Sequence, residues 1–271
     1  MLAISTLRRV ALGVVFALPF ATALPAETAD NTGPADDPID AQARDLIQAA
    51  TDFLSNQDKL QVNWFVTYDT VVDGREKLTD VRSGFTFLSR SEGFVSATEN
   101  GLKSRDFYFD GAAFYIVDPD ANSYVLAPFE GSYEDLIVRI RDEYDMALPI
   151  WSILSNRSKG EWLESAESAA YLGVTRIAGR EVHHIAASNY DHDWQLWIST
   201  DAERPELVML VGTDPYQQGW PQYRVYFHDW VFDPDYDPNV FAYTPDEDAS
   251  RMAWPKPVLD DANSGPQEGD E

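Results

Sequence analysis

The residues best suited to bind a metal ion or act as a general base are four histidines, His183, His184, His192 and His228. Adjacent residues of a β-strand point to opposite faces of a sheet, so His183 and His184 cannot share one metal ion if segment 181–187 is extended. His192 lies between two aspartates, which is typical of a solvated hairpin loop. His228 lies between strand-like aromatic residues, which favours a hydrogen-bonded structural role. The histidines therefore predict neither a metal centre nor a catalytic base.

Acidic residues are numerous, but they form no complete catalytic or metal-binding pattern. Asp233, Asp235 and Asp237 alternate as calcium ligands do, yet the glycine at the sixth position and the glutamate at the twelfth are missing. Among 46 acidic residues, a choice of two carboxylates for glycoside hydrolysis would be arbitrary. The sequence has no G-x-S-x-G elbow and no cysteine. We therefore expect no enzyme, no metal and no cofactor, and a hydrolase with an acidic pair is only a remote alternative.

Aromatic and aliphatic side chains concentrate in the strand-like segments, and they offer a different chemistry. Such residues either fill a core or line a cavity that holds an apolar ligand. The sequence leaves both alternatives open. The candidates for lining a ligand cavity are Trp64, Val66, Phe87, Phe114, Ile116, Leu136, Ile137, Ile140, Ile150, Trp151, Leu154, Trp194 and Leu196.

The elements that must position these side chains begin with a helix. Apolar residues recur at helical spacing over 38–55, with Asp37 as the expected N-cap. From residue 60 to residue 72 apolar and polar residues alternate, which predicts a long, half-buried antiparallel strand. Four turn pairs then separate short apolar runs and predict a β-meander of hairpins: Asp73-Gly74, Glu92-Gly93, Asn100-Gly101 and Asp110-Gly111.

Helices interrupt the strands in the middle of the chain. A capping sequence at 132–135 opens one helix, Pro149 can start another, and a third short helix is expected from 161 to 171. Helices followed by a further run of strands favour an α+β class, with helices packed on one side of a large antiparallel sheet. The strands expected after Gly173 are 181–187, 194–199, 206–213 and 222–230.

The first 23 residues have the layout of a secretory signal peptide. A basic start is followed by an apolar run and by the small-x-small sequence Ala21-Thr22-Ala23. Cleavage would leave Leu24, or alternatively Glu27, as the first residue. The apolar run is about half the ~20 residues that a membrane span needs, and it contains Pro19, so we expect no transmembrane anchor. Lipid anchoring would need a cysteine, and the chain has none.

The rest of the chain is expected to form one domain over residues 38–258. Segments 24–37 and 259–271 are polar and predicted to be disordered. Without cysteines, stability must come from the core. The formal net charge of −26 repels nucleic acid and anionic membranes. We therefore expect an exported, periplasmic monomer that binds no nucleic acid.

Motifs in the C-terminal half resemble those of a known family. They are WQLWIS at 194–199, FHDW at 227–230 and FAYTP at 241–245. On these motifs, segment 39–255 resembles an uncharacterised family of predicted periplasmic proteins, which is itself similar to the LolA/LolB lipoprotein-carrier superfamily. The resemblance implies an unclosed antiparallel β-barrel, wrapped around a hydrophobic cavity and lidded by helices.

Two functions of different classes follow. The first is a non-enzymatic binding or carrier protein, which holds a lipid, an acyl chain or a lipidated partner between the sheet and the helices. The alternative is a protein-interaction or envelope-sensing module that docks a protein on the same face. In the lipoprotein carriers an arginine gates the cavity, and by location alone Arg139 and Arg141 on the expected lid helix are the candidates here.

Overall fold

The computed structural model describes residues 37–144, 149–156 and 164–254. The predicted signal peptide, nearly all of the predicted linker and the acidic tail lie outside these residues. Within them, no helix is long and apolar enough to cross a bilayer.

Twelve strands form two meanders and a short return. The first meander comprises β1 (Lys59–Val72), β2 (Glu76–Ser89), β3 (Gly93–Glu99), β4 (Ser104–Phe109), β5 (Ala113–Asp118) and β6 (Ser123–Pro128). The second comprises β7 (Ser168–Ile177), β8 (Arg180–Ser188), β9 (Asp193–Ser199), β10 (Leu207–Thr213) and β11 (Gln222–Phe232), and β12 (Ser250–Met252) follows. The predicted Asp73-Gly74 turn connects β1 to β2, and both residues have a positive φ, of 50° and 70°.

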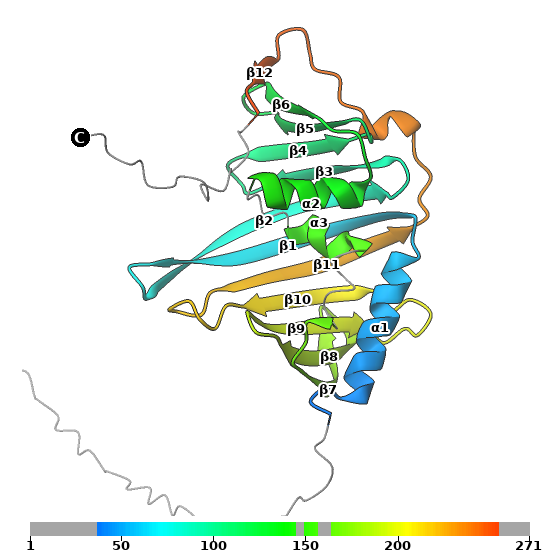
Figure 1. The fold of residues 1–271 in the computed structure, drawn as a ribbon, viewed down its shortest axis with the longest axis vertical. Helices are drawn as coiled ribbons and strands as arrows, with labels where there is room; N and C mark the ends of the chain where they lie inside the picture. Colours follow the sequence, from blue (N-terminus) through cyan, green and yellow to red (C-terminus); the bar gives the residue numbers. More distant parts are fainter. Residues whose placement is uncertain (1–36, 145–148, 157–163, 255–271) are drawn as a thin grey trace, which may run out of the picture. The chain divides into compact units, whose positions relative to one another are not determined.

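The twelve strands belong to one sheet, in the order β12-β6-β5-β4-β3-β2-β1-β11-β10-β9-β8-β7 (Figure 1). All neighbouring strands are antiparallel except β12 and β6, which are parallel. The pairing of β1 with β11 joins the two meanders. The edge strands β12 and β7 do not pair with each other, so the sheet is open. This confirms the predicted α+β class with one large, unclosed antiparallel sheet.

In the described part of the chain, three α-helices pack on one face of this sheet, which we call the inner face (Figure 1). They are α1 (Ala41–Ser55), α2 (Tyr133–Tyr144) and α3 (Pro149–Leu154). The predicted cap of α2 is present, because Ser132 Oγ accepts from the backbone N–H of Asp135 at 3.2 Å. The predicted cap of α1 was wrong. Asp40 caps this helix, accepting from the N–H groups of its second and third residues, whereas Asp37 pairs with Arg44.

The prediction of a helix over 161–171 was also wrong for most of the residues of this segment that the structure describes. Residues 161–163 lie outside the described residues, and Ser168 already begins β7. Ser168 pairs with Ser188 of β8, and the N–H of Ala169 also donates to the carbonyl of Pro38 at 3.1 Å. Pairing with a neighbouring strand and with the segment before α1 therefore overrides the helical preference of this segment.

Most of the apolar core lies between the inner face and the three helices. A smaller cluster lies on the opposite, outer face, where Phe87 and Val95 pack against Phe241 of the 3₁₀ helix η1 (Pro238–Phe241). Phe87 was expected to line the inner cavity, and this was wrong. Residues alternate along β2, so Thr86 and Leu88 belong to the inner face while Phe87 contacts Tyr236 and Phe241 outside.

Candidate ligand-binding cavity

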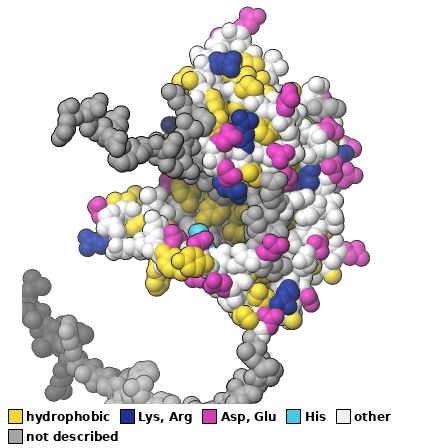
Figure 2. Space-filling view, viewed as in Figure 1, with side chains coloured by type: hydrophobic (Ala, Val, Ile, Leu, Met, Phe, Trp, Pro, Cys, Tyr) yellow, Lys and Arg dark blue, Asp and Glu magenta, His cyan; other side chains and the backbone are white. Residues whose placement is uncertain are grey.

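A cavity of about 410 Å³ lies on the inner face, between the middle of the sheet and α3. Figure 2 shows a hollow with hydrophobic side chains at its base near the centre of this face. The residues around the cavity come from five strands and from α3: Trp64, Val66, Tyr68, Arg82, Thr98, Arg105, Phe107, Ile150, Trp151 and Tyr223. The structure thus brings together four of the predicted ligand-binding residues, Trp64, Val66, Ile150 and Trp151.

The floor of the cavity is set by the alternation of β1. Trp64, Val66 and Tyr68 are every second residue, so all three side chains face inward. Trp64 pairs with Gly84 of β2, where an added Cβ would lie 2.5 Å from the indole Cζ2 atom. The glycine therefore makes room for the Trp64 ring, whose N–H donates to Thr86 Oγ1 at 3.1 Å.

The roof of the cavity is α3, and aromatic contacts hold it against the sheet. Trp151 is 4% exposed, and its ring centroid lies 4.4 Å from that of Phe107 and 5.0 Å from that of Phe94. The hydroxyl of Tyr133 donates to the Trp151 carbonyl at 2.7 Å, which ties α3 to α2. The indole N–H of Trp151 is buried and has no acceptor in the described structure.

One largely buried arginine contacts each of these three helices or the residues that follow them. Arg90, at the end of β2, donates to the carbonyls of Gln57, Leu54 and Leu154 at 2.9, 3.1 and 3.1 Å. It also forms an ion pair with Glu134 of α2 at 3.3 Å. Its side chain is only 14% exposed. A single side chain therefore holds the ends of α1 and α3 and the start of α2.

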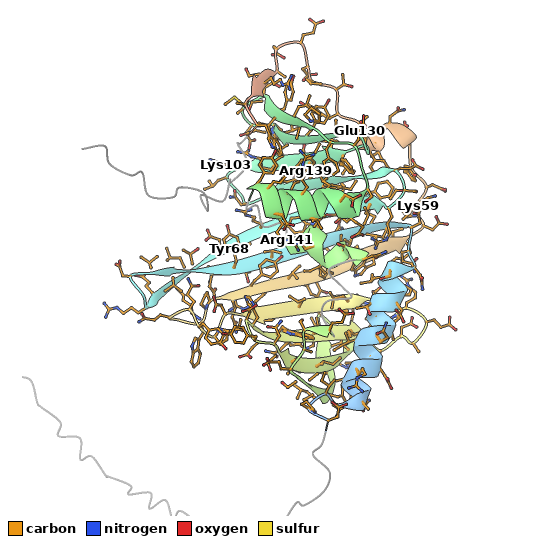
Figure 3. All side chains as sticks on the ribbon, in the orientation of Figure 1. Lys59, Tyr68, Lys103, Glu130, Arg139 and Arg141 are labelled. Atoms are coloured by element: carbon orange, nitrogen blue, oxygen red, sulfur yellow. The ribbon has the colours of Figure 1, made fainter. Side chains whose placement is uncertain are left out.

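Polar groups gather at one side of this otherwise apolar cavity. Arg82 Nη2 donates to the hydroxyl of Tyr68 at 2.9 Å, and Figure 3 labels Tyr68 on β1. The hydroxyl of Tyr223 is buried and has no partner among the residues described. Burial raises the pKa of Tyr223, so the phenol keeps its proton. Arg105 forms an ion pair with Asp118 at 2.6 Å.

The polar residues of this site were not identified as functional from the sequence. A single arginine in a strand is typical of a solvated surface position, so Arg82 gave no signal of its own. The alternation of β1 placed Tyr68 inward, but the pairing of β1 with β11, which brings Tyr223 opposite Tyr68, is a long-range contact. No local pattern in the sequence indicates that contact.

The other predicted cavity residues lie elsewhere on the inner face. Phe114, Leu136 and Ile140 line a second space of about 150 Å³ beneath α2. Packed in the core without lining the larger cavity are Ile116, Ile137, Leu154, Trp194 and Leu196.

The two predicted gating arginines do not line the larger cavity. Arg139 pairs with Glu143 at 3.0 Å and lies over the ring of Phe129. Arg141 pairs with Asp142 at 2.8 Å. Figure 3 labels both arginines on α2. The arginines at the larger cavity are instead Arg82 and Arg105, on β2 and β4.

Three of the four histidines have local side-chain partners. His183 bonds to the hydroxyl of Tyr171 at 2.9 Å, and His184 bonds to Gln195 at 2.9 Å on the other face of β8. His228 bonds to the adjacent Asp229 at 2.8 Å. In the described part of the chain, no three His, Asp or Glu residues come close enough together to hold a metal ion.

Two of the three alternating aspartates after β11 have local partners. Asp237 caps η1 by accepting from the backbone N–H of Asn239 at 2.9 Å. Asp233 lies 3.5 Å from the ammonium nitrogen of Lys59. Asp233 and Asp237 therefore have local roles that require no cation.

Comparison with known proteins gives one family match. The family described as "Predicted periplasmic protein (DUF2092)" matches residues 43–253. Curated proteins give no significant match.

Solved structures are similar at low sequence identity. An uncharacterized conserved protein from Thermus thermophilus is 10% identical over 79% of this chain and 99% of its own, with a TM-score of 0.43. LprF from Mycobacterium bovis is 13% identical over 73% and 98%, with a TM-score of 0.44. A LolA superfamily protein from Nitrosomonas europaea is 11% identical over 74% and 97%, with a TM-score of 0.35.

Proposed function

The chain belongs to the DUF2092 family of predicted periplasmic proteins, and on that premise we propose that it is a non-enzymatic carrier or binding protein for a lipid or an acyl chain. The ligand lies in the cavity beneath α3. In this proposal the segment 1–23 directs export and is removed, and the mature protein acts in the periplasm.

The observation that carries this proposal is the cavity itself. Protein interiors are packed about as densely as organic crystals, and voids larger than a water molecule are few. A space of about 410 Å³, walled mainly by aromatic and aliphatic side chains, is within the range of ~300–1,000 Å³ typical of small-molecule sites. Burial of an acyl chain there removes apolar surface from water, which is the main source of affinity for such a ligand.

The buried N–H of Trp151 supports a ligand with an oxygen atom. A buried donor without an acceptor costs about 1–3 kcal/mol. An ester oxygen of a lipid in the cavity would supply the acceptor that the described residues do not provide.

Native mass spectrometry of protein isolated from the periplasm without detergent tests the proposal. We expect a mass adduct in the range of a lipid, and we expect the neutral dye N-phenyl-1-naphthylamine to bind to delipidated protein. An adduct-free spectrum together with no dye binding would refute carriage. A protein partner isolated with such lipid-free protein would favour the docking module instead.

A pair of matched variants locates the binding site. Val66→Phe places a ring in the cavity, because Val66 is 4% exposed and lines it. Val81→Phe makes the same change on the outer face of the sheet, where Val81 is 44% exposed. Dye and lipid should be lost from the Val66 variant and retained by the Val81 variant. Equal binding by the two variants would place the ligand elsewhere.

A further inference from the structure

Three hydrogen-bonding side chains meet at one side of the cavity, on three adjacent strands. Tyr68 of β1 is paired directly with Tyr223 of β11. Arg82 of β2 is paired with Val66, two residues before Tyr68 and on the same face. All three side chains line the cavity. The cluster therefore borders the same space as the apolar residues.

The cluster offers donors and lacks a matching acceptor. The Tyr68 oxygen accepts from Arg82, so its own hydroxyl hydrogen can be donated to another group. The Tyr223 hydroxyl has no partner in the described structure, although it is buried. Arg82 has N–H groups beyond the one that bonds to Tyr68. Two phenols and a guanidinium can thus donate to one ligand group.

Arg82 also has no carboxylate partner among the described residues, whereas Arg105 on the same cavity is paired with Asp118. Asp80 shares a face with Arg82, but its carboxylate accepts from Thr70 at 3.2 Å. The chain carries a net charge of −26, so carboxylates are abundant. A cation left unpaired at the side of an apolar cavity provides a local positive potential there.

We propose that Arg82, Tyr68 and Tyr223 bind the anionic headgroup, a carboxylate or a phosphate, of a single-chain amphiphile. Its acyl chain lies beneath α3, so the inference rests on the proposed function and adds the class of ligand. Arginine matches the oxygen geometry of both anions with paired N–H donors. Arg82 is exposed to solvent, which places the headgroup at the mouth of the cavity and the chain inside.

The neighbouring strand leaves room for such a headgroup. Gly212 of β10 is paired with Tyr223, and no atom lies within 4 Å of the position that a Cβ would take there. The inner face beside the backbone of Tyr223 is therefore open on the β10 side.

Displacement of bound N-phenyl-1-naphthylamine from delipidated protein tests the inference. The competitors share one chain length and differ only in the headgroup: dodecanoate, dodecyl phosphate, dodecanol and dodecyltrimethylammonium. Each is used below its micellar concentration or, for dodecanol, below its solubility limit. The wild type should bind the two anions about tenfold more tightly than dodecanol, because charge-assisted hydrogen bonds to the headgroup add affinity of that size. Dodecyltrimethylammonium should bind no better than dodecanol. A preference for only one of the two anions identifies which headgroup the cluster selects.

Variants separate headgroup binding from chain binding. Arg82→Gln should remove the preference for anions and leave the affinity for dodecanol unchanged, and Tyr223→Phe should reduce the preference in part. Arg176→Gln removes the same charge from an exposed arginine on β7 and should change neither affinity.

A failure of the headgroup inference can be distinguished from a failure of the proposed function. If the wild type binds dodecanol and the anions equally, or if Arg176→Gln has the same effect as Arg82→Gln, the headgroup inference is overturned and lipid carriage stands. If neither the dye nor any of the amphiphiles binds, the proposed function itself fails.

Discussion

Replacement of Arg90 by methionine should destabilise the protein more than any surface change of the same kind. Methionine fills much of the same space but cannot donate to the carbonyls of Leu54, Gln57 and Leu154, nor pair with Glu134. A bond from a charged group is worth about 1.5–3 kcal/mol, and loss of one partner of a buried ion pair costs about 3–5 kcal/mol. Glu134 keeps its bond from the backbone N–H of Asn156, so the contributions do not simply add. We expect a loss of about 3–5 kcal/mol in the free energy of unfolding.

Urea denaturation followed by tryptophan fluorescence measures this loss. Arg44→Met is the matched control, because Arg44 also pairs with a carboxylate, that of Asp37, but its side chain is 45% exposed. An exposed pair contributes about 0–1 kcal/mol. If the two variants lost the same free energy, or if Arg90→Met lost less than about 1 kcal/mol, Arg90 would not be the residue that holds the helices.

Three further predictions concern the sheet and the absence of a metal requirement. Burial raises the pKa of Asp69, but bonds from Arg224, from Thr79 and from the N–H of Gln222 outweigh it and hold the pKa below its usual value. The ionised carboxylate therefore stabilises the fold above about pH 4, and this contribution is lost as the pH falls through the folded-state pKa. Asp69→Asn should flatten the acid side of a curve of unfolding free energy against pH. An unchanged slope would contradict this prediction. Gly84→Ala should lower the free energy of unfolding by about 1–3 kcal/mol, because the added Cβ would collide with the Trp64 ring. Thermal unfolding measures this loss, and tryptophan emission should shift. A neutral effect would mean that the indole has another position. Treatment with EDTA should leave the Tm unchanged, whereas a drop that calcium restores would show that the aspartates after β11 bind an ion.

Local patterns were sufficient to predict most of the fold. The alternation along β1 and the turn at Asp73-Gly74 specify the first hairpin, and Ser132 with Asp135 specifies the start of α2. The errors arose where a distant partner decides the conformation. Ser168 begins a strand because β8 lies beside it.

The candidate site was predictable only in its apolar part. A strand with apolar residues on both faces gives no sign of which face is which, so Phe87 was assigned to the wrong side of β2. The donor cluster depends on the pairing of Tyr68 with Tyr223, which only the assembled sheet creates. Sequence periodicity reports which residues share a face. It reports neither which face is the inner one nor which residue lies opposite across a long-range pair.

The junction between β1 and β11 has a consequence for how the molecule assembles. Every other antiparallel pair joins strands that are consecutive in the chain, whereas Arg224 donates to Thr67 across 157 residues. Contacts between distant residues are slow to form because closing a long loop costs entropy. Each meander can therefore form from local hairpins, and we expect the junction between them to form last. Residues on both sides of this junction line the cavity, so we expect the chain to gain this cavity only in the final folding step. Until then, two unpaired strand edges are exposed to aggregation.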